Sequence, residues 1–144
     1  MRILLIFAAA IALLAIASCS DDGYSRITDK VVKDECGACH MAYQPEFLPA
    51  ESWKAIMSGL ADHFGGDATL DASVVRHITD YLVQHAGSEP GHKTARPRLR
   101  ITRLDWFVKK HAGEVSRRAM KRAGVMSNCT ACHRGANEGS YEDD

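Results

Sequence analysis

Apolar residues recur at spacings of three and four along two segments in the first half of the chain. The first segment begins after Ser52, a suitable N-cap residue, and ends before Gly65 and Gly66. The second segment begins after Asp71, which can also cap a helix, and ends at Gly87. The stripes consist of Trp53, Ile56, Leu60 and Phe64 in the first and Val74, Val75, Ile78, Tyr81, Leu82 and His85 in the second. The pattern predicts helices over 52–64 and 71–85.

The rest of the chain has weaker patterns. Residues 27–35 form a short amphipathic stretch, 43–49 read as a loop because they contain two prolines, and 88–98 read as a linker rich in proline and glycine. Residues 105–111 predict a short helical turn, whereas 113–124 are mostly polar and only weakly periodic. In no segment do apolar and polar residues alternate as they do in a β-strand. We therefore expect an all-α fold of two small lobes with much loop.

The first 19 residues have the order of a secretory signal. Arg2 precedes an apolar run from 3 to 17, which ends in Ile-Ala-Ser-Cys at 16–19. These four residues fit a lipobox, in which Cys19 would be lipidated and become the first mature residue. The alternatives are cleavage near Ala17, which would leave a free thiol, and an uncleaved anchor helix. The pattern favours export to the periplasm with a membrane tether at Cys19.

Four of the five cysteines lie in two CxxCH motifs, at 36–40 and 129–133. In this motif two thiols form thioether bonds to haem vinyl groups, and the following histidine binds the iron. The motifs therefore predict two haem c groups, attached through Cys36, Cys39, Cys129 and Cys132 and bound by His40 and His133. The rival interpretations are a four-cysteine zinc site and a pair of redox disulfides, but neither needs a histidine after the second cysteine.

Each iron also needs a ligand on its other face, unless that face is open. His63 is the candidate for the first haem, because it ends the predicted 52–64 helix; this element order is similar to small single-haem cytochromes c. His111 is the candidate for the second haem, because it follows Trp106 and Phe107, which could line a pocket. The alternatives there are His92, Met120 and Met126. His85 is either a core residue or a rival ligand, and His77 is expected in solvent.

Charge is distributed unevenly, although 18 basic residues balance 18 acidic ones. Residues 93–122 hold eleven Lys and Arg against two acids, whereas residues 21–89 hold twelve acids against five bases. The basic segment is expected either to dock on an acidic partner or to be a solvated face that also pairs with haem propionates. Nothing in the chain is typical of a nucleic-acid-binding module.

The motifs together resemble those of the bacterial periplasmic dihaem cytochrome c family. The similarity rests on Cys36–Tyr43, Phe47–Ala50, Ser52-Trp53, Gly59-Leu60 and His63–Gly65, and then on Ile101-Thr102, Trp106-Phe107, His111 and Asn128–His133. It implies two mainly helical lobes with one haem each and His/His ligation of both irons. It also implies electron exchange with a small oxygen-binding monohaem cytochrome and, in some cases, with membrane b-type cytochromes.

Taken together, the sequence predicts a signal over 1–19, a cytochrome c-like lobe over 20–90 and a second haem lobe over 91–144. The expected function is electron transfer between a membrane or periplasmic donor and a partner cytochrome, without enzymatic activity. The alternative is a haem enzyme or ligand-binding protein, with peroxidase, nitric-oxide or oxygen chemistry at a labile distal site. A haem-based sensor is a weaker third possibility, because the chain carries no fused signalling segment.

Overall fold

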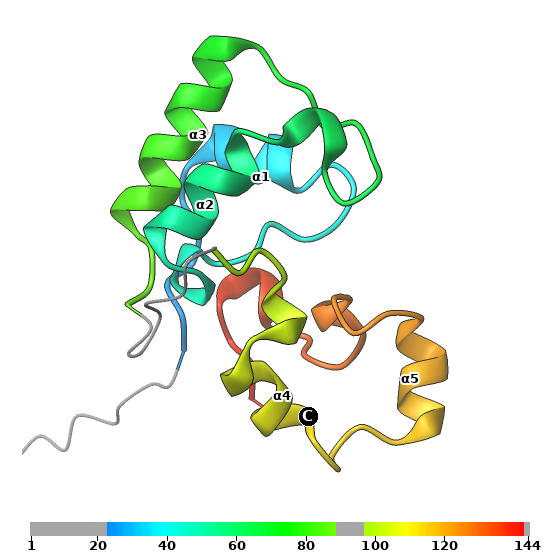
Figure 1. The fold of residues 1–144 in the computed structure, drawn as a ribbon. Helices are drawn as coiled ribbons and strands as arrows, with labels where there is room; N and C mark the ends of the chain where they lie inside the picture. Colours follow the sequence, from blue (N-terminus) through cyan, green and yellow to red (C-terminus); the bar gives the residue numbers. More distant parts are fainter. Residues whose placement is uncertain (1–22, 89–96, 143–144) are drawn as a thin grey trace, which may run out of the picture.

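The structure is a computed structural model that describes residues 23–88 and 97–142. The signal segment, Cys19 and His92 lie outside the described residues. The helices are α1 (Lys30–Cys36), α2 (Ala50–Met57), α3 (Ala72–Gln84), α4 (Asp105–His111) and α5 (Arg117–Ala123). Short 3-10 turns lie at Pro45–Phe47, Leu60–Asp62, Ile101–Arg103, Cys129–Ala131 and Ala136–Glu138. Figure 1 shows α1, α2 and α3 in one group and α4 and α5 in another.

The main packing contact of the first group is between α2 and α3. Ile56 and Met57 of α2 and Ile78 and Leu82 of α3 are buried in one hydrophobic cluster, to which α1 adds Val32. Each such side chain contributes about 1.5–3 kcal/mol by leaving water. The apolar stripes predicted from the sequence therefore form the core of this group in part, through Trp53, Ile56, Ile78 and Leu82.

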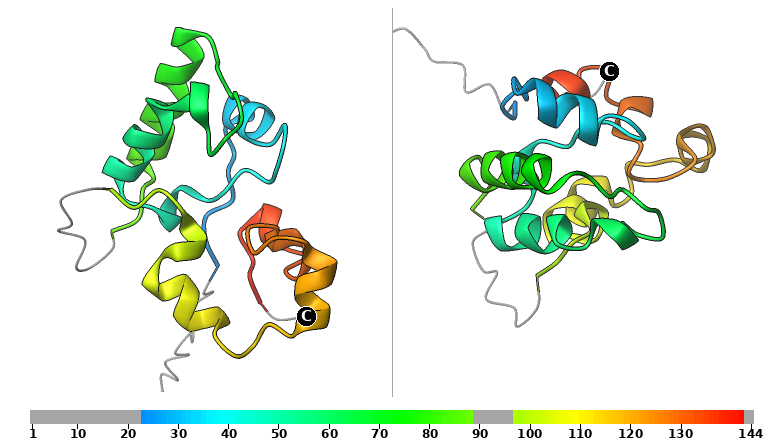
Figure 2. Two further views of the ribbon diagram at one scale, coloured as in Figure 1. Left: turned by 45° about the vertical axis from the view of Figure 1, so that its right-hand side comes forward. Right: turned by 90° about the horizontal axis from the view of Figure 1, so that it is seen from above.

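The second group of helices joins this core through α4 and the residue before it, whereas α5 has no buried residue. Leu104 and Phe107 are buried in the same cluster as Ile27 from the start of the described chain. The two ends of the described part of the chain also meet, because the Tyr24 N–H donates to the Gly139 carbonyl at 2.8 Å. Figure 2 shows the beginning of the described chain beside its C-terminal turns in both views.

The helix predicted over 52–64 is wrong in both its start and its end. The helix begins at Ala50, where Pro49 occupies the N-cap position with no side-chain bond, and Ser52 is fully buried inside it. Proline fixes the φ of the residue at the helix entry, and the Pro49 carbonyl accepts from the N–H groups of Ser52 and Trp53. The helix ends at Met57 and a separate turn covers Leu60–Asp62. Phe64, expected on the buried stripe, has a positive φ of 58° and is 45% exposed.

The other helix predictions differ in outcome. The 71–85 prediction is confirmed by α3, although the Asp71 side chain at its N-cap makes no capping bond. The helical turn predicted over 105–111 is confirmed by α4. Helix α5 lies in the 113–124 segment for which no helix was predicted; Ser116 caps it and Gly124 ends it with φ 76°. The described residues contain no strand, and none of their helices is both long and apolar enough to cross a membrane.

Candidate haem sites

The first CxxCH motif continues directly from α1. Cys36 is the last residue of the helix, and the Gly37 N–H donates to the Lys33 carbonyl at 3.0 Å. A Cβ at position 37 would lie 2.3 Å from that carbonyl oxygen, so glycine is required here. Burial, with a smaller effect of the Glu35 charge, raises the pKa of the Cys36 thiol to about 11. The helix end thus presents Cys36 toward the interior and leaves Cys39 exposed.

His40 is oriented by a backbone bond. Its Nδ1 donates to the Met41 carbonyl at 2.7 Å, which leaves the lone pair of Nε2 free to bind a metal. The ring of His63 lies parallel to that of His40, with ring centres 6.2 Å apart and planes inclined by 19°. Burial and the nearby His40 lower the pKa of His63, which favours the neutral form that a metal ligand requires.

A tight turn holds His63 in place. Its N–H donates to the Gly66 carbonyl at 2.7 Å, and its carbonyl accepts from the Gly66 N–H at 3.2 Å. The Asp62 carboxylate accepts from the Gly65 N–H at 3.1 Å. Phe64 packs edge-on against His63, and the guanidinium of Arg100 lies 4.4 Å from the centre of the Phe64 ring. A residue from the second half of the chain therefore contacts the turn that presents His63.

The second motif lies on a 3-10 turn, Cys129–Ala131, rather than at a helix end. The His133 N–H donates to the Cys129 carbonyl at 2.8 Å, which closes the motif on itself. Burial, the largest effect, raises the pKa of the Cys129 thiol. Nδ1 of His133 donates over 3.4 Å to the Glu142 carbonyl, and its ring packs against Tyr141.

His111, the last residue of α4, faces His133. Its Nδ1 donates to the Phe107 carbonyl at 2.8 Å, and its ring stacks on that of Phe107 with centres 4.0 Å apart. The ring centres of His111 and His133 are 6.2 Å apart, and their planes are inclined by 87°. The two histidine pairs thus share one separation but differ in the relative orientation of their rings.

This common separation fits a haem iron. Two opposite imidazoles, each with a metal–nitrogen bond of about 2 Å and roughly 1 Å more to the ring centre, have ring centres about 6 Å apart. Both pairs lie at 6.2 Å, and each contains one histidine that directly follows a CxxC pair. The residues present therefore fit two haem groups with two histidines each.

The remaining candidate ligands are placed elsewhere. His85 is exposed and stacks on Tyr81, so it is not a core residue. His77 is also exposed, as expected, and its Nε2 lies 2.8 Å from an Asp29 carboxylate oxygen. Met126 packs against the hydrophobic core and Met120 is half-buried on α5. Within 23–88 and 97–142, no three His, Cys, Asp or Glu side chains converge as a four-cysteine zinc site would require.

Tyr43 connects the two sites, and the sequence interpretation gave it no role. Its ring stacks on His40 with centres 4.9 Å apart. Its hydroxyl donates to the Ser127 carbonyl at 2.8 Å, two residues before Cys129. Burial and the nearby Cys129 raise the pKa of Tyr43. The only signal in the sequence is its position three residues after His40, and that spacing does not reveal a partner 84 residues away.

A second side chain, that of Gln44, also links the two halves of the chain and lies deeper in the interior. The fully buried Gln44 donates from Nε2 to the Ala136 carbonyl at 2.8 Å and accepts from the Tyr141 hydroxyl. A hollow of about 450 Å³ is lined by residues of both motif loops, His40 and Thr130 among them. The two sites are therefore neighbours in one structure, joined by side chains that cross between the halves.

These features define a class of protein: a small all-α c-type haem protein with two neighbouring sites. The family profile of dihaem cytochrome c matches residues 32–141. The chain belongs to the dihaem cytochrome c family and carries two haem c groups. A search of curated proteins gives no match.

Solved structures with the same fold are also dihaem cytochromes c. One from Rhodobacter sphaeroides is 46% identical, with a TM-score of 0.75, over 80% of this chain and 98% of that one. A second structure from the same organism is 48% identical, with a TM-score of 0.71, over 79% and 97% of the chains. One from Shewanella baltica is 40% identical, with a TM-score of 0.67, over 78% and 86%. The predictions of family, of the all-α fold and of two haem c groups are confirmed.

Proposed function

We propose that this protein is an electron carrier in which each haem is closed on both faces by histidine. The first haem would be attached through Cys36 and Cys39 and bound by His40 and His63. The second would be attached through Cys129 and Cys132 and bound by His133 and His111. The observation that carries the proposal is the 6.2 Å separation of the ring centres in both pairs.

Haem iron held by two imidazoles exchanges electrons between the ferric and ferrous states without losing a ligand. The protein's part is to keep both imidazoles in place. Backbone carbonyls accept the Nδ1 protons of His40 and His111, so Nε2 is the free nitrogen in both rings. Two imidazoles stabilise the ferric state more than a His/Met pair does, so both reduction potentials should be low for a cytochrome c.

The organisation of the whole chain follows from the same proposal. Residues 1–19 would direct export and leave Cys19 as a lipid anchor, residues 20–90 would hold the first haem, and residues 91–144 the second. The carrier would act in the periplasm and exchange electrons with a small monohaem cytochrome or a membrane b-type cytochrome.

Carbon monoxide tests whether both irons are closed. It binds ferrous haem that has a free or labile axial position, and it cannot bind where two histidines stay in place. We expect the visible spectrum of the reduced protein, with both haems attached, to stay unchanged when carbon monoxide is added. A shift in part of the spectrum would contradict the proposal and would favour ligand binding or catalysis at one haem.

A further inference from the structure

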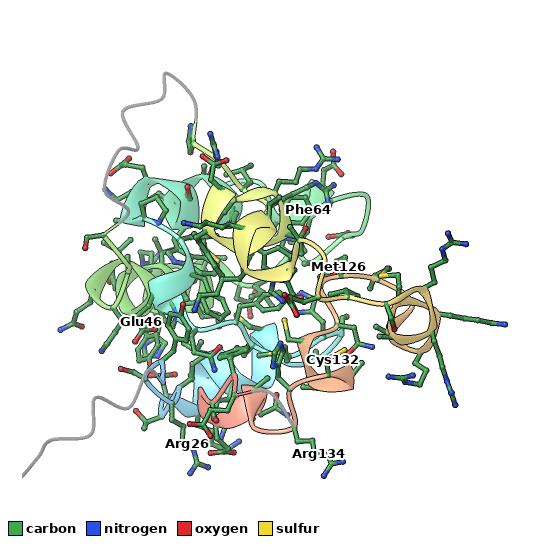
Figure 3. All side chains as sticks on the ribbon, turned by 90° about the horizontal axis from the view of Figure 1, so that it is seen from below. Arg26, Glu46, Phe64, Met126, Cys132 and Arg134 are labelled. Carbon is green, nitrogen blue, oxygen red and sulfur yellow. The ribbon has the colours of Figure 1, made fainter. Side chains whose placement is uncertain are left out.

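Helix α5 carries a cluster of positive charge at the edge of the molecule. Its cations are Arg117, Arg118, Lys121 and Arg122, all exposed, and two more exposed cations, Lys109 and Lys110, end the preceding helix α4. Figure 3 shows α5 at the margin of the structure with its long side chains directed away from the rest of the chain. In the views of Figure 2 the helix likewise lies at the periphery. These charges are therefore available to a partner.

The charges in this cluster are not neutralised by the protein itself. Within the described residues none of the six cations forms an ion pair, whereas cations elsewhere do. Arg26 pairs with Glu138 at 2.6 Å, Lys54 with Glu51 at 2.8 Å and Arg98 with Asp105 at 3.0 Å. Glu114 is the one acidic residue between positions 106 and 122. The cluster thus has a strong local field.

Part of this arrangement disfavours the helix that carries it. Arg117 and Arg118 occupy the first turn, which contains no acidic residue, although the helix dipole there favours negative charge. Arg117 and Lys121, and likewise Arg118 and Arg122, are like charges four residues apart, which weakens a helix. Lys121 and Arg122 lie in the last turn, where the dipole favours positive charge. The folding of α5 therefore gives no reason for Arg117 and Arg118, whereas binding to an acidic surface does.

Helix α5 is linked directly to the second haem motif. The side-chain amide of Asn128, the residue before Cys129, donates to the Ala123 carbonyl at 3.0 Å. Gly124 ends the helix, and four residues lie between it and Cys129. A partner seated on α5 would consequently contact the segment that leads directly into the haem motif at Cys129–His133.

We propose that the basic face of α5 docks an acidic surface of a redox protein, so that electrons enter or leave through the second haem. This inference rests on the proposed electron-carrier function and names the chemistry of its partner. Ala119, Met120 and Ala123 of α5 are half-buried, and the exposed large apolar side chains near the cluster are two separate valines, Val108 and Val125, so α5 does not present the broad apolar face that inserts into membranes. An acidic protein therefore fits better than a lipid surface.

The test uses the protein with both haems attached and a strongly acidic plant-type ferredoxin as the redox probe. We would measure the second-order rate of electron transfer by stopped flow at several ionic strengths. Arg118→Glu should lower the rate about fivefold at low salt, and Arg118→Glu/Arg122→Glu should lower it further. Arg76→Glu on α3 is the matched control, because Arg76 is also an exposed helical arginine without an ion pair in the described residues.

The control variant should keep its rate within about 1.5-fold, and the wild-type rate should fall steeply with salt. Equal losses in Arg118→Glu and Arg76→Glu would overturn the proposal, because they would reflect net charge and not a local surface. Hexacyanochromate(III), an inert paramagnetic anion, should broaden amide resonances of residues 117–123 more than those of α3. Broadening centred on the first haem would overturn the assignment to the second.

Two further measurements distinguish a protein partner from a lipid surface, and a failure of the docking proposal from a failure of the electron-carrier proposal. Vesicles of phosphatidylglycerol and phosphatidylcholine should not sediment the protein lacking residues 1–19; binding that Arg118→Glu abolishes would identify a lipid surface and overturn the proposal. Reduction by dithionite needs no docking site and should be unaffected by the variants. If dithionite still reduces both haems of a variant while the ferredoxin rates do not depend on α5, the docking proposal fails and the electron-carrier function stands.

Discussion

Three of the four candidate ligands, His40, His111 and His133, have a ring nitrogen that donates a hydrogen bond to a backbone carbonyl. His40 bonds to the next residue in the chain, and His111 bonds to the carbonyl four residues earlier in its helix. A ring fixed in this way loses little conformational freedom when it binds a metal. The two sites nevertheless differ, since the ring planes are inclined by 19° in the first and by 87° in the second.

Removal of a distal histidine should open one haem and leave the other closed. In both His63→Ala and His111→Ala we expect carbon monoxide to shift roughly half of the reduced haem absorbance, because one of the two irons loses its sixth ligand. Visible spectroscopy of each reduced variant, before and after the gas is added, is the measurement.

His85→Ala serves as the control for both ligand variants. His85 also bonds through Nδ1 to a carbonyl four residues earlier, at 2.8 Å, but its ring stacks on Tyr81 and is exposed. The visible spectrum of reduced His85→Ala should not change when carbon monoxide is added. A response in His85→Ala, or none in His63→Ala, would refute the ligand assignment.

Tyr43 should contribute to both sites at once. Tyr43→Phe keeps the ring that stacks on His40 but removes the bond to Ser127, so we expect a loss of about 1 kcal/mol in unfolding free energy. The paramagnetically shifted NMR signals of both haems should also move. In Tyr81→Phe, whose hydroxyl makes no hydrogen bond within the described residues, both readouts should stay near wild type. Changes confined to one haem would show that Tyr43 does not connect the sites.

At the scale of elements, the turn that presents His63 depends on two adjacent glycines with different roles. Gly65 has φ 101°, a backbone conformation that residues other than glycine rarely adopt. Gly66 has no positive φ, and a Cβ there would meet only the His63 carbonyl, at an ordinary contact distance of 3.7 Å. The turn therefore requires glycine at the first position but not at the second.

Gly65→Ala should strain this turn by about 1 kcal/mol and should weaken the hold on His63. We expect a lower urea midpoint and partial binding of carbon monoxide to one reduced haem. Gly66→Ala is the matched control and should change neither quantity measurably. If the two variants behave alike, the backbone conformation of Gly65 is not what positions His63.

The sequence predicts these elements well where packing decides them and poorly where the chain changes direction. Helix α3 was predicted because its apolar stripe packs on α2, and a buried stripe places apolar residues at regular helical spacing in the sequence. The predicted 52–64 helix was wrong because apolar spacing continues through the break after Met57, where Leu60 lies on a separate turn. Helix α5 was missed because its outer face is basic, although Ser116 and Gly124 were readable as its cap and its end.

The same limit applies to the candidate sites. The CxxCH motifs are local in sequence, so they could be recognised at once, and His63 and His111 could be proposed from element order. Contacts between distant segments have no such local pattern. Neither the bond from Tyr43 to Ser127 nor the bond from Gln44 to Ala136 could have been read from spacing. The sequence therefore predicts what each haem needs but not how the two sites are held together.

At the scale of the molecule, the two ends of the described chain close on each other. Tyr24 donates to Gly139 through the backbone, and its ring packs edge-on against Tyr141 with centres 5.5 Å apart. Arg26 also pairs with Glu138, but both side chains are more than half exposed, so this ion pair contributes little. The close backbone contact at Gly139 and the packing of the Tyr24 ring are therefore expected to carry most of the interaction.

Gly139→Ala tests this contact, because a Cβ there would lie 2.0 Å from the Tyr24 carbonyl oxygen. Gly113→Ala is the matched control: φ is 84° at Gly113 and 87° at Gly139, but a Cβ at position 113 meets no atom within 4 Å. The control should lose about 1 kcal/mol of unfolding free energy from backbone strain alone. Gly139→Ala should lose roughly 2 kcal/mol more, because the segment around Tyr24 must move away. Urea unfolding of the protein with both haems attached gives both values. Equal losses in the two variants would mean that the N-terminal segment moves aside at no cost and does not hold the two halves together.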